Sequence, residues 1–134
     1  MKLKKIQRFF DWANCQVFDG KLPRVKIVIK DLTDAYGQLQ VRYTKSGFIH
    51  KKWLEIDPVM CMCHDEQYDT IDVVNQVIVH EMVHLFQLQE KGIKPHRMLS
   101  YFRKHPKDLF DKFGKIAYDK GITNNQKLNL TNAI

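Results

Sequence analysis

The chain has 134 residues, of which 44% are hydrophobic and 28% are charged, and its formal net charge at pH 7 is +7. This length supports one domain with a modest hydrophobic core and excludes two. The composition is ordinary for a globular protein and excludes a disordered or low-complexity chain.

The N-terminal segment is basic from Met1 to Ile6, but no continuous apolar region follows it. Apolar residues recur instead at helical spacing, which predicts an amphipathic first helix: Ile6, Phe9, Phe10, Ala13 and Val17. Such a pattern is neither a signal peptide nor a membrane span. We therefore expect a cytoplasmic protein that has no membrane partner.

Three β-rich segments follow a turn at residues 18–23, in which Gly20 ends the first helix and Pro23 blocks its continuation. Residues 24–29, 36–43 and 48–56 alternate well enough to predict three strands. A turn at residues 44–47 should join the second strand to the third as a hairpin. We therefore expect a small three-stranded sheet.

A central helix is predicted over residues 71–88, where apolar side chains cover nearly the whole circumference, as in a buried helix. It carries His80, Glu81 and His84 in the order H-E-x-x-H. Residues four apart share one helix face, so both imidazoles can bind one zinc ion, with Glu81 as general base. The alternative is a chance motif whose histidines only form hydrogen bonds on a solvated stripe.

Two shorter helices are predicted after Gly92: one over residues 96–104, which Pro95 opens, and an amphipathic one over residues 108–119. Gly121 should end the last helix. We expect one domain over residues 1–122 and a flexible tail over residues 123–134, which is rich in asparagine.

A catalytic zinc site needs a third protein ligand, with its fourth position open to water. We expect His96 to be this ligand, because it lies just past the turn that ends at Pro95, where the chain can fold back. Glu90 is disfavoured, because Gln87 stands where a glycine would have to break the helix. His105 and a carboxylate such as Asp108 or Asp111 remain as further candidates.

The cysteines Cys15, Cys61 and Cys63 are odd in number and imply no disulfide framework in a cytosolic chain. Cys61, Cys63 and His64 are also spaced like metal ligands. A structural zinc site usually needs a second ligand pair, however, so we favour ordinary reduced thiols.

Positive charge is concentrated in residues 91–107 and in residues 42–52, which carry six and four lysines or arginines and no acid. This segregation predicts a face that binds a polyanion such as DNA, the alternative being clustered surface charge. Tyr43, Trp53 and Tyr101 could stack on unpaired bases, whereas Phe102 is better explained by core packing. The predicted nucleic-acid-binding residues are Lys91, Lys94, Arg97, Arg103, Lys104, Lys107, Arg42, Lys51 and Lys52.

Several motifs together resemble the SprT-like family of zinc metalloproteases: the turn at residues 18–23, Tyr36-Gly37 opening a strand, the motif at residues 79–84, and a later His96 followed by aromatics. The resemblance implies a zincin-like α+β fold with an N-terminal helix, a small sheet, a central motif helix and C-terminal helices. It also implies that His80, His84 and His96 hold one Zn²⁺ and that Glu81 is the catalytic base.

The expected function is a zinc-dependent endopeptidase acting on a protein or peptide. Because the family includes a protease of DNA-crosslinked proteins, the resemblance adds single-stranded or protein-crosslinked DNA as a partner. Tyr101 and His105 are candidates for stabilising the oxyanion. The alternative is a non-catalytic, zinc-containing module that binds nucleic acid or another protein.

Overall fold

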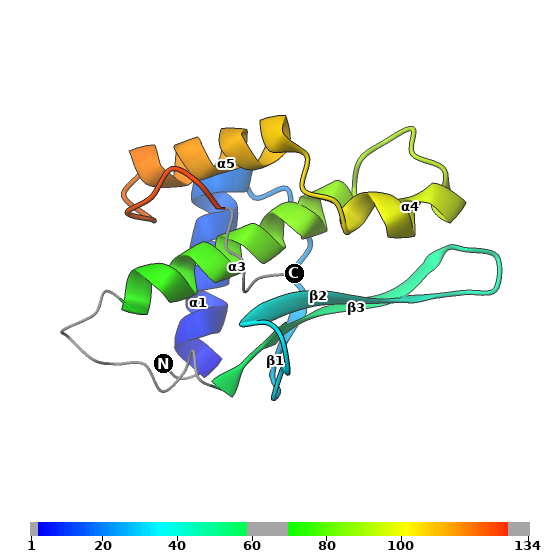
Figure 1. Ribbon diagram of the computed structural model, residues 1–134, viewed down its shortest axis with the longest axis horizontal. Helices are drawn as coiled ribbons and strands as arrows, with labels where there is room; N and C mark the ends of the chain where they lie inside the picture. Colours follow the sequence, from blue (N-terminus) through cyan, green and yellow to red (C-terminus); the bar gives the residue numbers. More distant parts are fainter. Residues whose placement is uncertain (1–2, 59–69, 129–134) are drawn as a thin grey trace.

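The computed structural model describes residues 3–58 and 70–128 and shows an α+β fold with four helices and one three-stranded sheet in these ranges (Figure 1). Cys61, Cys63 and His64, the weaker metal-ligand candidates, lie outside the described residues. The elements in chain order are α1 (Leu3–Phe18), β1 (Lys26–Ile29), β2 (Gly37–Tyr43), β3 (Ile49–Ile56), α3 (Thr70–Gln87), α4 (Pro95–Phe102) and α5 (Lys107–Asp119).

The sheet has the strand order β1-β3-β2, so β3 is central and β2 is an edge strand. The predicted hairpin is confirmed: β2 pairs antiparallel with β3, and Gln40 lies opposite Trp53. β1 runs parallel to β3, with Ile27 opposite Leu54. A parallel pair needs a long connection, and β2 lies within that connection, antiparallel to both.

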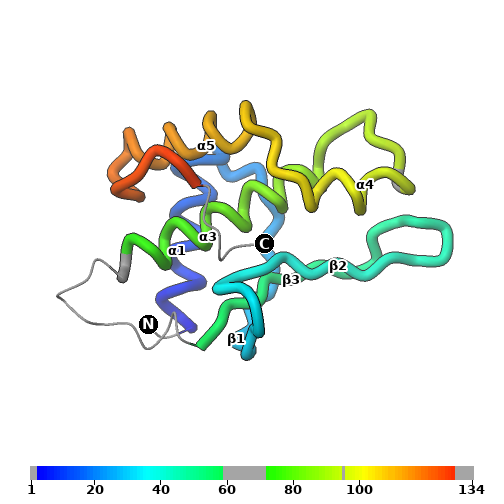
Figure 2. The backbone as a smooth tube through the Cα atoms, in the orientation of Figure 1, coloured from blue at the N-terminus to red at the C-terminus, as the bar shows by residue number. Residues whose placement is uncertain are grey.

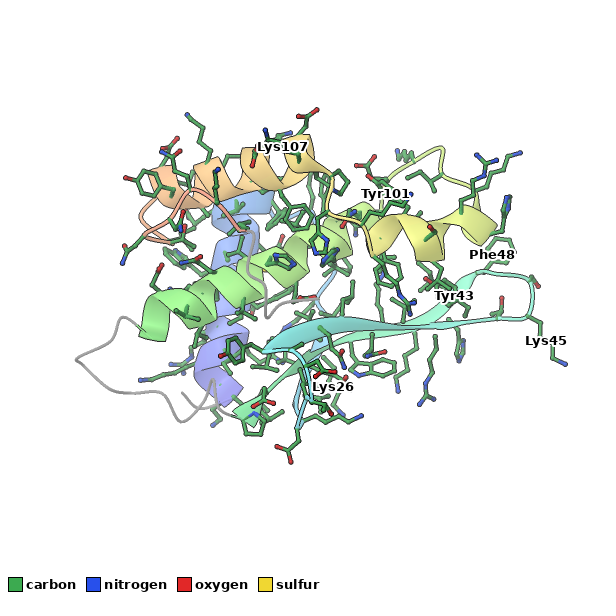
Figure 3. The ribbon with its side chains drawn as sticks, in the orientation of Figure 1. Lys26, Tyr43, Lys45, Phe48, Tyr101 and Lys107 are labelled. Carbon is green, nitrogen blue, oxygen red and sulfur yellow. The ribbon has the colours of Figure 1, made fainter. Side chains whose placement is uncertain are left out.

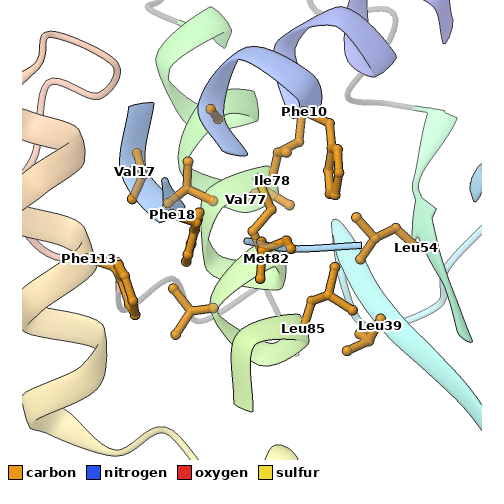
Figure 4. Packing of buried hydrophobic residues seen from close by; sticks show 14 of the residues in the cluster. Phe10, Val17, Phe18, Leu39, Leu54, Val77, Ile78, Met82, Leu85 and Phe113 are labelled. Atoms are coloured by element: carbon orange, nitrogen blue, oxygen red, sulfur yellow. The ribbon is translucent and has the colours of Figure 1, made fainter. Parts of the chain in front are cut away.

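Helix α3 is the centre of the molecule, because it contacts β2 of the sheet and also α1, α4 and α5. Its side chains are buried around the whole circumference, as its continuous apolar sequence predicts. Figure 4 shows Ile78, Met82 and Leu85 of α3 in one apolar cluster with Phe10 of α1 and Leu54 of β3. Polar side chains placed on this helix are therefore held in a rigid, largely dry environment.

The first strand of the hairpin comes very close to α3 at Gly37. A Cβ atom there would lie 2.7 Å from Val77 Cγ1 and 3.5 Å from Glu81 Cγ. Only glycine leaves room for this approach. The absence of a side chain at Gly37 thus brings the edge strand beside Glu81.

The chain after α5 folds back over the helices as far as Leu128, which is 1% exposed (Figure 2). Asn75 of α3 donates a hydrogen bond to the carbonyl oxygen of Ile122 at 3.2 Å. Gly114 of α5 permits this packing, because a Cβ atom there would overlap the backbone oxygen of Gln126. Residues 123–128 of the expected flexible tail thus contact α3 and α5, while residues 129–134 lie outside the described ranges.

Helix α4 begins at Pro95, as predicted, and extends beside the β2–β3 hairpin, which projects from the body of the molecule (Figures 1 and 2). Lys45 and Phe48 lie near the far end of this hairpin (Figure 3). Among the described residues, no helix combines the length and apolar character that crossing a membrane requires.

Candidate metal centre

Helix α3 presents His80 and His84 on one face, one turn apart, with ring centroids separated by 5.0 Å. The two residues are only 1% and 2% exposed. A buried imidazole costs free energy unless its ring nitrogens find partners. The hydrogen-bond partners of the ring nitrogens therefore indicate which nitrogens are free to bind a ligand.

A third imidazole reaches the pair from the connection between α4 and α5. His105 Nε2 lies 3.1 Å from His80 Nε2 and 3.2 Å from His84 Nε2. A tetrahedral zinc ion with Zn–N bonds of about 2.0–2.1 Å separates its nitrogen ligands by about 3.3 Å. The two distances from His105 are close to this separation, and the possible ligand atoms of the three histidines all lie within 4.8 Å of one another.

The outer nitrogens of the two α3 histidines are already hydrogen-bonded. His80 Nδ1 lies 2.5 Å from the carbonyl oxygen of Leu128, and His84 Nδ1 lies 2.7 Å from Gln87 Oε1. Both partners are oxygens that accept, so each Nδ1 carries the hydrogen and each Nε2 presents a lone pair. His105 can donate to only one of them. A cation would satisfy all three nitrogens at once.

Burial keeps these rings neutral. It lowers the pKa of His80 to about 4 and that of His84 to about 3, and for His84 the neighbouring His80 and His105 lower the pKa further. Burial also lowers the pKa of His105. Metal ions bind the neutral imidazole, so at neutral pH the three residues are in the ligand form.

The residues that form this group are His80, His84 and His105, whereas His96 is exposed on α4 and lies outside it. Our expectation of His96 as the third ligand therefore differs from the cluster that the structure assembles. The start of α4 does not bring His96 to the group. The chain returns at the end of that helix, where Gln87 contacts the backbone of Tyr101 and Lys104.

The two carboxylates considered as third ligands, Asp108 and Asp111, lie on α5 and do not belong to the group. The sequence offers His105 as a candidate without favouring it over His96. His105 directly precedes Pro106, the N-cap residue of α5, but this position by itself does not show that His105 meets the motif histidines.

Glu81 is fully buried, and neither carboxylate oxygen has a hydrogen-bond partner among the described residues. Burial raises the pKa of Glu81 well above its usual range, and the backbone of Leu39 on β2 opposes this rise only in part. An unpaired buried carboxyl group is costly and is rarely retained without a role. Its place next to His80 on the face toward β2 suggests a chemical role.

A cleft of about 300 Å³ opens between β2 and the ends of α3 and α4. It is lined by residues 38–41 of β2 together with His84, Phe102 and Arg103. Among the described residues β2 is an edge strand, so in this part of the chain no further strand pairs with the side of β2 away from β3. A metal ligand and an open sheet edge thus share one cavity.

The predicted basic residues lie on the projecting part of the molecule and on α5. Arg42 and Lys51 are opposite each other on the hairpin, and their charged groups lie 5.4 and 5.9 Å from the centre of the Trp53 ring. Arg103, at the end of α4, lies over the ring of Phe102 at 5.9 Å. The remaining ones lie on the hairpin, along α4 and its flanks, and at the start of α5: Lys52, Lys91, Lys94, Arg97, Lys104 and Lys107.

The aromatic residues considered for base stacking differ in their surroundings. Phe102 is buried in the core, as expected from its spacing. Tyr43 is half-buried, and burial raises its pKa, while the charge of Arg103 opposes that rise. Burial, followed by a hydrogen bond and a charge from Glu90, raises the pKa of Tyr101 to about 12. Of the four, Trp53 is the ring with two cations over it.

Comparison with known families supports the resemblance seen in the motifs. The model of the SprT-like family matches residues 6–118, which is more than four fifths of the chain and includes nearly all of the span from α1 to α5. Searches of the curated proteins and of the solved structures gave no significant match. On the family match, the chain belongs to the SprT-like family.

Proposed function

We propose that this chain is a zinc-dependent endopeptidase with a zincin-like arrangement of its catalytic groups. The observation that supports this most strongly is the meeting of three imidazoles, with the next residue after His80 carrying a fully buried carboxyl group that has no hydrogen-bond partner among the described residues. The histidine cluster alone could be a structural metal site, and a buried carboxyl group alone need not be catalytic. Together they would supply the ligands and the general base that metal-assisted peptide hydrolysis requires.

His80, His84 and His105 would hold the ion. Three neutral imidazoles at this spacing suit zinc, which binds three protein ligands in its catalytic sites and leaves a fourth position open. His105 is an exposed residue, so the open position would be on the solvent side. When bound there, a zinc ion would lower the pKa of its coordinated water and would polarise the carbonyl group of the scissile bond.

Glu81 would act as the general base. Its carboxylate would accept a proton from the attacking water and donate it to the amine that leaves. The base must be ionised to do this, whereas burial in the metal-free protein favours the protonated form. A cation at the histidine cluster would restore the carboxylate, because a nearby positive charge lowers a carboxyl pKa.

The edge strand β2 would bind the substrate. An extended peptide could pair with the backbone of residues 38–41 and would then pass His84 in the same cleft. This pairing uses hydrogen bonds to the peptide backbone, which every sequence has. It therefore suits unfolded protein segments, whose backbone groups are free to pair. Arg103 on the opposite wall would favour an acidic side chain in the bound segment.

The test is cleavage of a disordered protein such as casein by the zinc-loaded chain, compared with Glu81→Gln. This substitution keeps the size of the side chain but removes its basicity, so we expect the rate to fall at least about 100-fold with zinc binding retained. Asp119→Asn, which changes an exposed acid at the end of α5, serves as the control. Equal cleavage by wild type and Glu81→Gln would refute the mechanism.

A second activity, nucleic-acid binding, is favoured by the basic hairpin and α4, which project together from the body of the molecule (Figure 2). Residues of β2 and of the end of α4 also line the cleft. Arg42 and Lys51 around the Trp53 ring combine charge with an aromatic surface. Single-stranded nucleic acid is commonly bound by this combination. We propose that the basic face holds DNA near the active site and so directs cleavage to DNA-associated proteins.

The DNA proposal is tested by titrating a labelled single strand at several salt concentrations. We expect affinity to fall steeply with salt, and charge reversal of Lys94, Arg97 and Lys104 to flatten that slope. Reversal of Lys4, Lys5 and Arg8, which are exposed on α1, is the matched control. If the salt dependence of DNA affinity were the same for both variants, the proposal that DNA binds at Lys94, Arg97 and Lys104 would be refuted. DNA binding without any cleavage would instead favour a non-catalytic module.

A further inference from the structure

Gln87 is a buried polar residue that the proposed chemistry leaves without a role. It is the last residue of α3, it lies three positions after His84, and it is 0% exposed. A glutamine amide has two donor hydrogens and one acceptor oxygen, and burying them is costly unless each finds a partner. The partners of Gln87 are therefore informative.

The amide of Gln87 has its partners on two sides. Its Nε2 donates to the carbonyl oxygen of Tyr101 at 3.2 Å and to that of Lys104 at 3.0 Å. Its Oε1 lies 2.7 Å from His84 Nδ1. Carbonyl oxygens only accept, so the nitrogen must face them and the oxygen must face His84. The orientation of the amide is thus determined by its surroundings.

This orientation has a consequence for each of two histidines. An oxygen facing His84 Nδ1 requires a hydrogen on that nitrogen, which leaves the lone pair on Nε2, the atom that points at the cluster. The two donated bonds hold the backbone of the segment that immediately precedes His105. One side chain therefore contacts one candidate ligand directly and fixes the approach of another.

We propose that Gln87 is a positioning residue, which sets the tautomer of His84 and holds the α4–α5 connection so that His84 and His105 direct Nε2 to one cation. The inference rests on the metal centre of the proposed function, but it does not require that the protein be a protease. The competing explanation is that Gln87 only seals the end of α3. It would then affect stability without affecting the tautomer of His84.

Two substitutions separate the two halves of this role. Gln87→Glu keeps an acceptor for His84 Nδ1 but loses both donors to the connection. Gln87→Leu loses all three interactions. Gln76→Leu is the matched control, because Gln76 is also buried on α3 and its donated bond is to Asp72 on the same helix. Thermal unfolding of each metal-free variant would show that it folds.

The first measurement is the histidine tautomer in the metal-free full chain, from nitrogen-15 NMR of the imidazole groups. We expect the hydrogen of His84 on Nδ1 in the wild type, in Gln76→Leu and in Gln87→Glu. In Gln87→Leu we expect this preference to be lost. A wild type with the hydrogen on Nε2, or an unchanged tautomer in Gln87→Leu, would overturn the inference.

The second measurement is zinc affinity, by competition with a chromophoric chelator. Loss of an outer hydrogen-bond partner of a metal ligand weakens binding by about 10- to 100-fold, which we expect for Gln87→Leu and not for Gln76→Leu. Gln87→Glu keeps the partner of His84 but no longer holds the connection that carries His105, so we expect its affinity to lie between those of Gln87→Leu and the wild type. Affinities that all agree within about threefold would overturn the inference. If the variants show these relative zinc affinities but the wild type cleaves no protein, the protease function is refuted and the role of Gln87 stands. If the wild type binds no zinc, both the protease function and the role of Gln87 are refuted.

Discussion

At the scale of single residues, the site depends on which histidine completes the cluster. His105 reaches His80 and His84 at 3.1 and 3.2 Å, whereas His96 is exposed on another helix. Both are histidines that follow the motif within a basic segment. Because only His105 lies at the cluster, substituting each histidine in turn tests which of the two is the third ligand.

We predict that His105→Ala weakens zinc binding by more than about 100-fold, because losing a ligand costs more than losing its outer partner. His96→Ala should leave the affinity nearly unchanged. Both can be measured by chelator competition in the full chain. A strong loss in His96→Ala with none in His105→Ala would mean that the bound state uses a different ligand set.

Gly37 shows how a single residue fixes the distance between the sheet and α3. An added methyl group would lie 2.7 Å from Val77 Cγ1, so we predict that Gly37→Ala lowers the free energy of unfolding by about 1–3 kcal/mol. Urea denaturation measures the change. Adding Val77→Ala should recover part of the loss by making room. Simple additivity of the two losses would show that they do not share this contact.

At the scale of elements, the side chain of Glu55 on β3 contacts side chains from β2, from β3 itself and from the residue that follows β1. This buried carboxylate on β3 accepts hydrogen bonds from Gln38 at 2.6 Å and from Trp53 at 3.2 Å, and Lys30 lies 3.7 Å away. Burial alone would raise the pKa of Glu55. The hydrogen bonds from Gln38 and Trp53, with the charge of Lys30, lower it overall.

A lowered carboxyl pKa stabilises the fold above pH 4.5, the ordinary value, and this stabilisation is lost as the pH falls through the lowered value. We predict that Glu55→Gln is less stable than wild type by about 1–2 kcal/mol at pH 7, and that the difference shrinks as the pH falls below 4.5. Urea denaturation of both proteins at pH 7 and at a pH below 4.5 measures this difference in stability. Asp119→Asn, on an exposed ion pair, should change little at either pH. A difference that grows in acid would contradict the assignment.

At the scale of the whole molecule, three separate parts of the chain meet at the histidine cluster. These are the middle of α3, the α4–α5 connection, and the returning segment whose Leu128 carbonyl oxygen faces His80. An ion bound there would cross-link the first two of these parts directly. Metal binding and global stability should therefore be coupled.

We predict that zinc at 100 times its dissociation constant raises the free energy of unfolding by about 2.7 kcal/mol, and that a chelator reverses this. Thermal unfolding with and without zinc measures it. His105→Ala should show a much smaller gain at the same zinc concentration. An equal gain in both proteins would place the bound ion elsewhere.

Local patterns in the sequence determined much of this architecture. Apolar periodicity and turn residues predicted the helices, the hairpin and the start of α4 at Pro95, because these depend on neighbours within a few positions. The H-E-x-x-H spacing likewise predicted that His80 and His84 share one helix face and that Glu81 lies beside them. Helix geometry alone requires this arrangement.

Tertiary structure decided the rest, because it depends on contacts between distant positions. His105 lies 21 residues from His84, and Leu128 lies 48 residues from His80, so no local pattern could show that they meet. The same holds for β2 as the edge strand and for the bonds of Gln87 to the α4–α5 connection. The sequence determined by itself the pair of imidazoles and their neighbouring carboxyl group; only the packing of α3 against β2, α4 and α5 decided what surrounds them.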